Sequence, residues 1–118
     1  MEKFGIYSWN ELTTEYENST EIGVIIINNE DEDGGDWGAM GPSGPSVVVN
    51  FTFKNDKENI KITKKEFYIC NEYNEYEERE ATVRRMCKVL KCTEEELNQC
   101  IKIAERAAIK EFTNPTLI

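Results

Sequence analysis

Alternation of apolar and polar residues predicts strands in the first half of the chain. Residues 46–54 alternate with a period of two, which is typical of a strand with one buried face. Residues 22–27 are almost continuously apolar and β-branched, as in a strand covered on both faces. After a turn at 55–59, residues 60–63 would pair back as a third strand. In the clearest strand, one face would carry Val47, Val49, Phe51 and Phe53, and the other Val48, Asn50 and Thr52.

Two stretches of this half also carry helix signals. Residues 8–11, Ser-Trp-Asn-Glu, have the form of a capping box, and apolar residues recur after them at helical spacing. We therefore expect a short helix over about residues 9–17. Residues 63–66, Thr-Lys-Lys-Glu, are a second such box and slightly favour a helix from Lys64. The alternative is that residues 67–70, which have strand propensity, extend the third strand to Cys70.

The last third of the chain predicts a helical hairpin. An apolar face at helical spacing begins at Tyr76, and Thr93 with the three glutamates after it caps a second helix. The tight connection falls at residues 91–92, and residues 114–115, Asn-Pro, end the second helix. The apolar positions are Tyr76, Val83, Met86, Cys87 and Leu90, followed by Leu97, Cys100, Ile101, Ala104, Ala108 and Phe112.

These elements predict an α+β fold. The chain has 118 residues, which fits one domain. We expect a single domain over 1–118, sheet-rich at 1–63 and helical at 64–113, with a long acidic Gly/Pro loop at 28–46. Its small antiparallel sheet would have about three strands in meander order. A short N-terminal helix and the helical hairpin would pack on one face.

The charge is strongly one-sided. The formal net charge is −9, and all of it lies in residues 1–50, which hold one base and ten acids. Such a field attracts basic partners and repels phosphate backbones and anionic lipids. We therefore expect the partner to be the basic surface of a protein, with no direct binding of nucleic acid and no membrane binding.

The cellular compartment is predicted from what the chain lacks. Its first residues do not have the pattern of a secretory signal, and no apolar run approaches the ~20 residues that span a bilayer. We expect a cytoplasmic protein, whose four cysteines would be reduced thiols.

Catalytic and metal chemistry have little support in the sequence. The chain contains no histidine, so the commonest general base and every catalytic arrangement that uses imidazole are missing. The cysteines form no C-x2-C pair, which removes the usual zinc constellations. We predict that the protein is not an enzyme, with no catalytic residues, no cofactor and no metal.

The connection at 28–46 is the main candidate for a binding site. Loops longer than about 12–15 residues in a compact domain are usually functional or disordered. Trp37 and Met40 on a Gly/Pro scaffold suit a pocket on a partner, and acids surround them. The alternative is that Trp37 folds back into its own core. The predicted partner-binding residues are Glu30, Asp31, Glu32, Asp33, Asp36, Trp37 and Met40.

Two other motifs match incompletely. The run Asn29-x-Asp31-x-Asp33-Gly34 opens like a calcium loop, but Met40 stands where that loop needs a bidentate glutamate. The helical hairpin resembles a helix-turn-helix in having a basic stripe at Arg84, Lys88 and Lys91, beside Arg85. Its second helix, however, opens with three glutamates that would face phosphates.

The sequence thus favours a non-enzymatic, acidic protein-binding module. We expect an inhibitor or adaptor that blocks a basic surface of a partner protein, such as one that binds nucleic acid, and so acts as a nucleic-acid mimic. Small anti-defence and immunity proteins of phages and mobile elements offer an analogy. The alternatives are a calcium- or metal-binding loop protein that uses Asp31, Asp33 and Asp36, and a helix-turn-helix accessory DNA-binding protein. A homodimer would let the basic stripe pair with the acidic half of a second copy.

Overall fold

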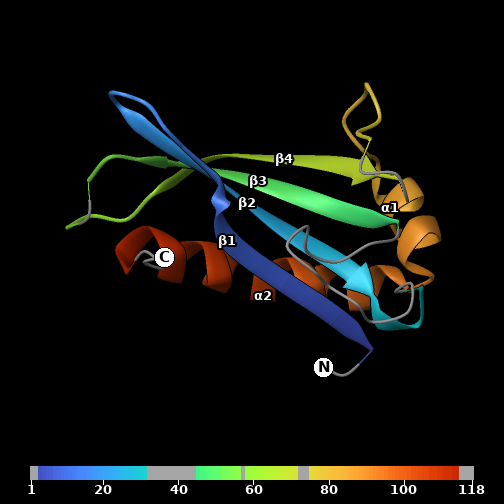
Figure 1. The fold of residues 1–118 in the computed structure, drawn as a ribbon. Helices are drawn as coiled ribbons and strands as arrows, with labels where there is room; N and C mark the ends of the chain where they lie inside the picture. Colours follow the sequence, from blue (N-terminus) through green and yellow to red (C-terminus); the bar gives the residue numbers. More distant parts are fainter. Residues whose placement is uncertain (1–2, 32–44, 57, 72–74, 115–118) are drawn as a thin grey trace.

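The structure, a computed structural model, describes residues 3–31, 45–56, 58–71 and 75–114. Figure 1 shows its elements in chain order. The strands are β1 (Phe4–Glu15), β2 (Ser19–Asn28), β3 (Ser46–Lys54) and β4 (Ile62–Cys70). A 3-10 turn (Asn29–Asp31) follows β2, and the helices are α1 (Val83–Leu90) and α2 (Glu94–Thr113).

The strands form one antiparallel sheet in the order β1-β2-β3-β4. In Figure 1, α2 lies along one face of this sheet and α1 stands at the end where β3 begins. The α+β class and the meander order are therefore confirmed. The sheet has four strands, one more than expected, and neither described helix covers its second face.

The N-terminal helix expected over residues 9–17 is wrong, because residues 9–15 belong to β1 and residues 16–17 to the turn after it. Residues 4–8 pair with the end of β2, and the register shifts between Ser8 and Thr13. The apolar β2 needs a paired neighbour on each side, and this long-range pairing outweighs a local capping signal. The helical spacing of the apolar residues coincides with the irregular part of the strand.

The helix expected from Lys64 is also wrong, and the alternative of a strand running to Cys70 is confirmed. Phe67 lies opposite Val49 and Ile69 opposite Val47, so both face the core. A capping box contributes only about 1 kcal/mol, which is less than the burial of two such side chains gives. The strand begins at Ile62, two residues later than predicted.

Residues 75–81 follow the outer edge of β4 and are not helical. The amide of Glu77 donates to the carbonyl oxygen of Ile69 at 2.9 Å, and that of Ala81 to Phe67 at 2.7 Å. The first helix therefore begins at Val83, after the N-cap Thr82, and not at Tyr76 as the apolar spacing predicted. Tyr76, which was assigned to the apolar face, is 54% exposed.

The second helix and the turn before it are confirmed. Thr93 caps α2 in a capping box with Glu96. Lys91 adopts a left-handed conformation with φ 51° and ends α1, and the amide of Cys92 donates to the carbonyl oxygen of Cys87 at 3.0 Å. This pattern is a Schellman motif, which lets the chain reverse within three residues.

The core lies between the sheet and α2. The face of β3 predicted to be buried is buried, and it packs with the apolar face of α2. The rings of Phe53 and Phe112 stack with centroids 4.6 Å apart. The fully buried large side chains include Ile22, Val24, Ile26, Val47, Val49, Phe51, Phe53, Leu90 and Leu97.

Candidate functional site

The residues predicted to bind a partner lie at and beyond the end of β2. Glu30 is exposed in the 3-10 turn, and Asp31 closes that turn. The other five residues, Glu32, Asp33, Asp36, Trp37 and Met40, lie outside the described residues. Their contact with a partner, and the alternative that Trp37 folds back, stay predictions.

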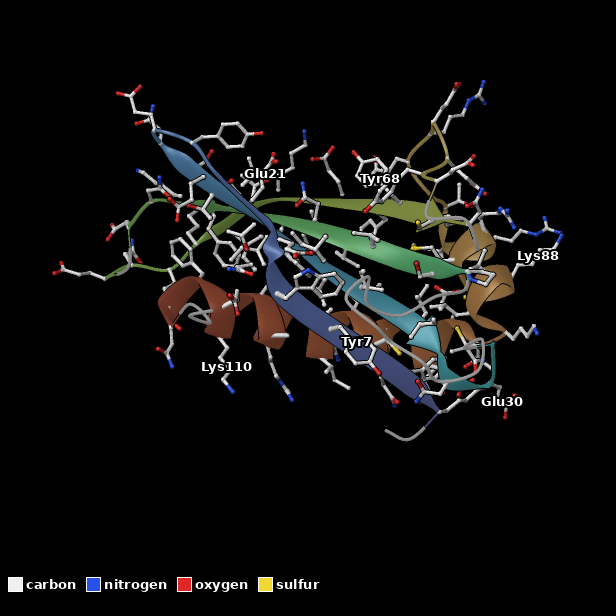
Figure 2. The ribbon with its side chains drawn as sticks, in the orientation of Figure 1. Tyr7, Glu21, Glu30, Tyr68, Lys88 and Lys110 are labelled. Carbon is white, nitrogen blue, oxygen red and sulfur yellow. The ribbon has the colours of Figure 1, made fainter. Side chains whose placement is uncertain are left out.

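The start of this connection is anchored by a buried amide. Asn28 Nδ2 donates to the carbonyl oxygen of Leu90 at 2.8 Å, and Asn28 Oδ1 accepts from the amide of Glu30 at 2.9 Å. The side chain of Asn28 is 1% exposed. The acidic connection therefore leaves the sheet beside the C-terminal end of α1, and Figure 2 shows Glu30 and Lys88 at this same end of the molecule.

Two cysteines near the turn between α1 and α2, Cys92 and Cys100, have thiols of low reactivity. Burial raises the pKa of Cys92 to about 12 and that of Cys100 to about 11, so both are neutral at pH 7 and weak nucleophiles. Burial also raises the pKa of the Cys70 thiol. Within the described part of the chain, no three metal-ligating side chains come together.

A different surface, which we call the open face, lies on the side of the sheet turned away from α2. Side chains alternate along a strand, and directly paired residues share a face. Tyr7 pairs with Ile25, Ile25 with Val48, and Val48 with Tyr68. These four residues form one apolar and aromatic row across all four strands.

Two glycines make room for this row. A Cβ atom on Gly5 would lie 2.5 Å from the ring of Tyr7, so that ring folds back over Gly5. A Cβ atom on Gly23 would lie 3.3 Å from the Cβ of Leu12 and 3.7 Å from Val48. The irregular part of β1 thus places Leu12 over Gly23, where it widens the apolar row.

Carboxylates surround the Tyr68 end of the row. The Tyr68 hydroxyl donates to Glu66 Oε2 at 2.6 Å. This hydrogen bond, then burial, and then the negative charges of Glu66, Glu80 and Glu21 raise the pKa of Tyr68 to about 12. Lys64 offsets part of this charge through an ion pair of 3.6 Å with Glu66. In Figure 2, Tyr68 and Glu21 both point away from α2.

The segment that follows the outer edge of β4, beside Tyr68, is held to both the sheet and α1. Glu80 Oε1 accepts from the amide of Phe67 at 3.4 Å, which ties the segment beside β4 to the sheet. Arg85 forms an ion pair of 2.7 Å with Glu77 and anchors the same segment to α1.

Two residues of the predicted basic stripe, Arg84 and Lys88, are exposed on α1.

Sequence reasoning found only part of the open face. The alternation in β3 placed Val48, Asn50 and Thr52 on one face, which the structure confirms. Tyr7 and Tyr68 were missed because their strands were not recognised over those residues. The alternation of residues 4–7, Phe-Gly-Ile-Tyr, was the signal that could have placed Tyr7 opposite the core.

In the described part of the chain, neither helix has the length and apolar character that crossing a membrane requires. Comparison with protein-family models, with curated proteins and with solved structures finds no match to this chain. The function must therefore be argued from the chain's own residues.

Proposed function

We propose that this chain is a non-enzymatic protein-binding module whose open face binds a basic surface of another protein. The observation that carries the proposal is the row of Tyr7, Ile25, Val48 and Tyr68, edged by carboxylates. The module acts as an inhibitor or adaptor, because a small domain that covers a basic surface denies that surface to the anionic ligands that would otherwise bind there.

The half-buried members of the row, Tyr7, Ile25 and Tyr68, supply contact area, whereas Val48 between them is already buried. Tyrosine is enriched at the energetic centres of protein interfaces, since its ring buries area at low conformational cost and its hydroxyl tolerates water. Tyr68 is held in place by its hydrogen bond to Glu66, and the Tyr7 ring by its packing over Gly5. The two rings are therefore ordered before a partner binds, which lowers the entropic cost of association.

The carboxylates determine which partners the open face can bind. Glu21, Glu66 and Glu80 make the Tyr68 end of the row negative, and the net charge of −9 adds long-range attraction for cations. Charges at the rim of an interface mainly raise the association rate and exclude partners of the same sign. A surface rich in lysine and arginine fits this arrangement, and a phosphate backbone does not.

The acidic connection at 28–46 forms a second part of the proposed binding surface. Its start is fixed at Asn28, and the seven predicted contacts would extend the binding surface beyond the sheet: Glu30, Asp31, Glu32, Asp33, Asp36, Trp37 and Met40. The lack of histidine and the raised pKa values of Cys92 and Cys100 support a binding role over a catalytic one.

The test is quantitative capture by the purified, tagged chain, with two matched variants. One variant neutralises the open face with Glu21→Gln, Glu66→Gln and Glu80→Gln. The control neutralises three exposed glutamates elsewhere with Glu58→Gln, Glu94→Gln and Glu95→Gln, so both variants lose the same charge. We expect the open-face variant to bind its partner about tenfold more weakly and the control to bind as the native chain does.

A third variant separates the sheet from the connection. It combines Trp37→Ala with Asp31, Asp33 and Asp36 changed to Asn. If only this variant loses the partner, the binding site is the connection and the open face is not used. If the captured protein binds nucleic acid, adding the native chain should release that nucleic acid, and a failure to do so would remove the inhibitor role.

A further inference from the structure

The outer face of α2 carries a row of cations that the proposed function does not use. Lys102, Arg106 and Lys110 follow each other at four-residue spacing, which places them on one face of the helix. All three are exposed, and the salt bridges among the described residues are formed by other cations: Lys3, Lys64, Lys65 and Arg85. We call this row the helix stripe.

The helix stripe and the open face lie on opposite sides of the molecule. In Figure 2, Lys110 points away from the sheet below α2, whereas Glu21 and Tyr68 point away from it above the sheet. The core of the protein lies between the two surfaces. They cannot meet within one chain, so they can meet only between two copies.

We propose that the helix stripe of one copy docks on the open face of a second copy, in a head-to-tail contact. The long stems of the cations would cover the exposed parts of Tyr7, Ile25 and Tyr68, which are half-buried, while their charged ends reach the carboxylates around Tyr68. Ile103, which is 36% exposed on α2, adds an apolar side chain beside the stripe. The sheet already accepts a helix on its other face, where α2 itself packs.

The residues beside the stripe favour a second copy over nucleic acid. The exposed first turn of α2 carries Glu94 and Glu95, which would repel a phosphate backbone laid along the helix. The net charge of −9 opposes such a complex from a longer distance. The open face of a second copy places only a local group of carboxylates against the stripe, so Glu94 and Glu95 repel it less than they repel a continuous phosphate backbone, while the net charge of each copy still opposes the contact.

This contact would regulate the binding site. A head-to-tail interface uses two different surfaces, so each added copy leaves one open face free at the end of the assembly. The remaining open faces are covered and cannot take a partner. This consequence rests on the proposed function, but the self-association itself does not. The net charge of −9 makes the contact weak and reversible.

Sedimentation of the purified full chain, over a range of concentrations, tests the contact. The face variant carries Glu21→Lys and Glu66→Lys, and the stripe variant carries Lys102→Glu, Arg106→Glu and Lys110→Glu. A control changes three other exposed bases, Lys54→Glu, Lys61→Glu and Arg79→Glu. We expect the native chain to associate, and each of the first two variants to need at least about tenfold higher concentration than the control.

Mixing the two variants is the decisive step, because reversed charges on both surfaces are again complementary. The mixture should associate at concentrations at which neither variant does so alone. A native chain that stays monomeric, a stripe variant no weaker than the control, or a mixture that stays monomeric would each overturn the proposal. If added DNA duplex binds the native chain but not the stripe variant, the stripe is a phosphate site and the proposal is likewise wrong.

The stripe variant also separates this proposal from the proposed function, because its open face is unchanged. A stripe variant that is monomeric and still captures the partner supports both. A chain that never self-associates but captures its partner through the open face overturns only the contact between copies.

Discussion

Asn28 and Leu90 are joined by a buried hydrogen bond across 62 positions of the sequence, from the Asn28 side chain to the last carbonyl group of α1. Oδ1 of the same side chain accepts from the backbone amide of Glu30. One side chain therefore connects the end of β2, the turn between α1 and α2, and the start of the acidic connection. We predict that Asn28→Ala lowers the free energy of unfolding by about 1–3 kcal/mol, because a buried carbonyl loses its donor.

Urea denaturation measures this change, and Asn98→Ala on the exposed face of α2 serves as the control. The control should stay within about 0.5 kcal/mol of the native chain. Equal stability of the two variants would show that the Asn28 hydrogen bond does not hold the helical turn against the sheet.

Alkaline pH should weaken the fold through Tyr68. The hydrogen bond to Glu66 raises the pKa of Tyr68 from 10.0 to about 12, so the folded state keeps its proton longer than the unfolded state. This contribution is complete below pH 10 and is lost as the pH rises through 12. We predict that stability falls between these values, and that Tyr68→Phe flattens this part of the pH profile.

Absorbance near 295 nm follows the ionisation directly. The native chain should show a tyrosine that ionises near pH 12, and Tyr68→Phe should lack it. If Tyr68→Phe instead removes a tyrosine that ionises near pH 10, Tyr68 is not held by Glu66 and the ordered end of the open face is incorrect.

Asn55 ties the two hairpin ends together. The side-chain Nδ2 of Asn55 donates to the carbonyl oxygen of Tyr16 at 2.8 Å, and its backbone amide donates to the carbonyl oxygen of Asn18 at 3.2 Å. Its Oδ1 accepts from the hydroxyl of Thr20. We predict that Asn55→Ala speeds amide hydrogen exchange at residues 16–20 by about tenfold, while the core strands keep their protection. Unchanged exchange in this turn would contradict the role of Asn55.

The N-cap of α2 can be tested against a threonine at the other end of the same helix. Thr93 accepts from the amide of Glu96 at 3.1 Å, so Thr93→Ala should cost about 1 kcal/mol of stability. Thr113 is exposed and donates to the carbonyl oxygen of Ile109. Thr113→Ala should lower stability by less than half as much as Thr93→Ala. Thermal or urea unfolding of the two variants gives the comparison.

The elements predicted correctly are those in which the local pattern agrees with the tertiary contacts. In β3 the alternation matches the burial of Val47, Val49 and Phe51, and in α2 the capping box and the apolar face both favour a helix. In β1 and β4 the local capping signals pointed to helices, while pairing with β2 and β3 favoured strands. Pairing depends on residues far away in the sequence, so local reasoning could not weigh it.

The assembly of the open face from four strands could not be predicted, for a related reason. Val48 and Tyr68 are neighbours only because of the register between β3 and β4, and register is a property of two strands together. The acids around Tyr68 also come from three separate segments, represented by Glu21, Glu66 and Glu80. The predicted acidic connection, in contrast, could be recognised from composition alone.

The most direct test of the central claim is photo-crosslinking from two positions on opposite sides of the molecule. A benzoylphenylalanine replaces Asn50 on the open face in one chain and Gln99 on the exposed face of α2 in the other. We predict that a protein with a basic surface is crosslinked from position 50, and that Glu21→Gln with Glu66→Gln and Glu80→Gln abolishes this product. A partner crosslinked from position 99 and not from position 50 would contradict the claim that the open face is the binding site.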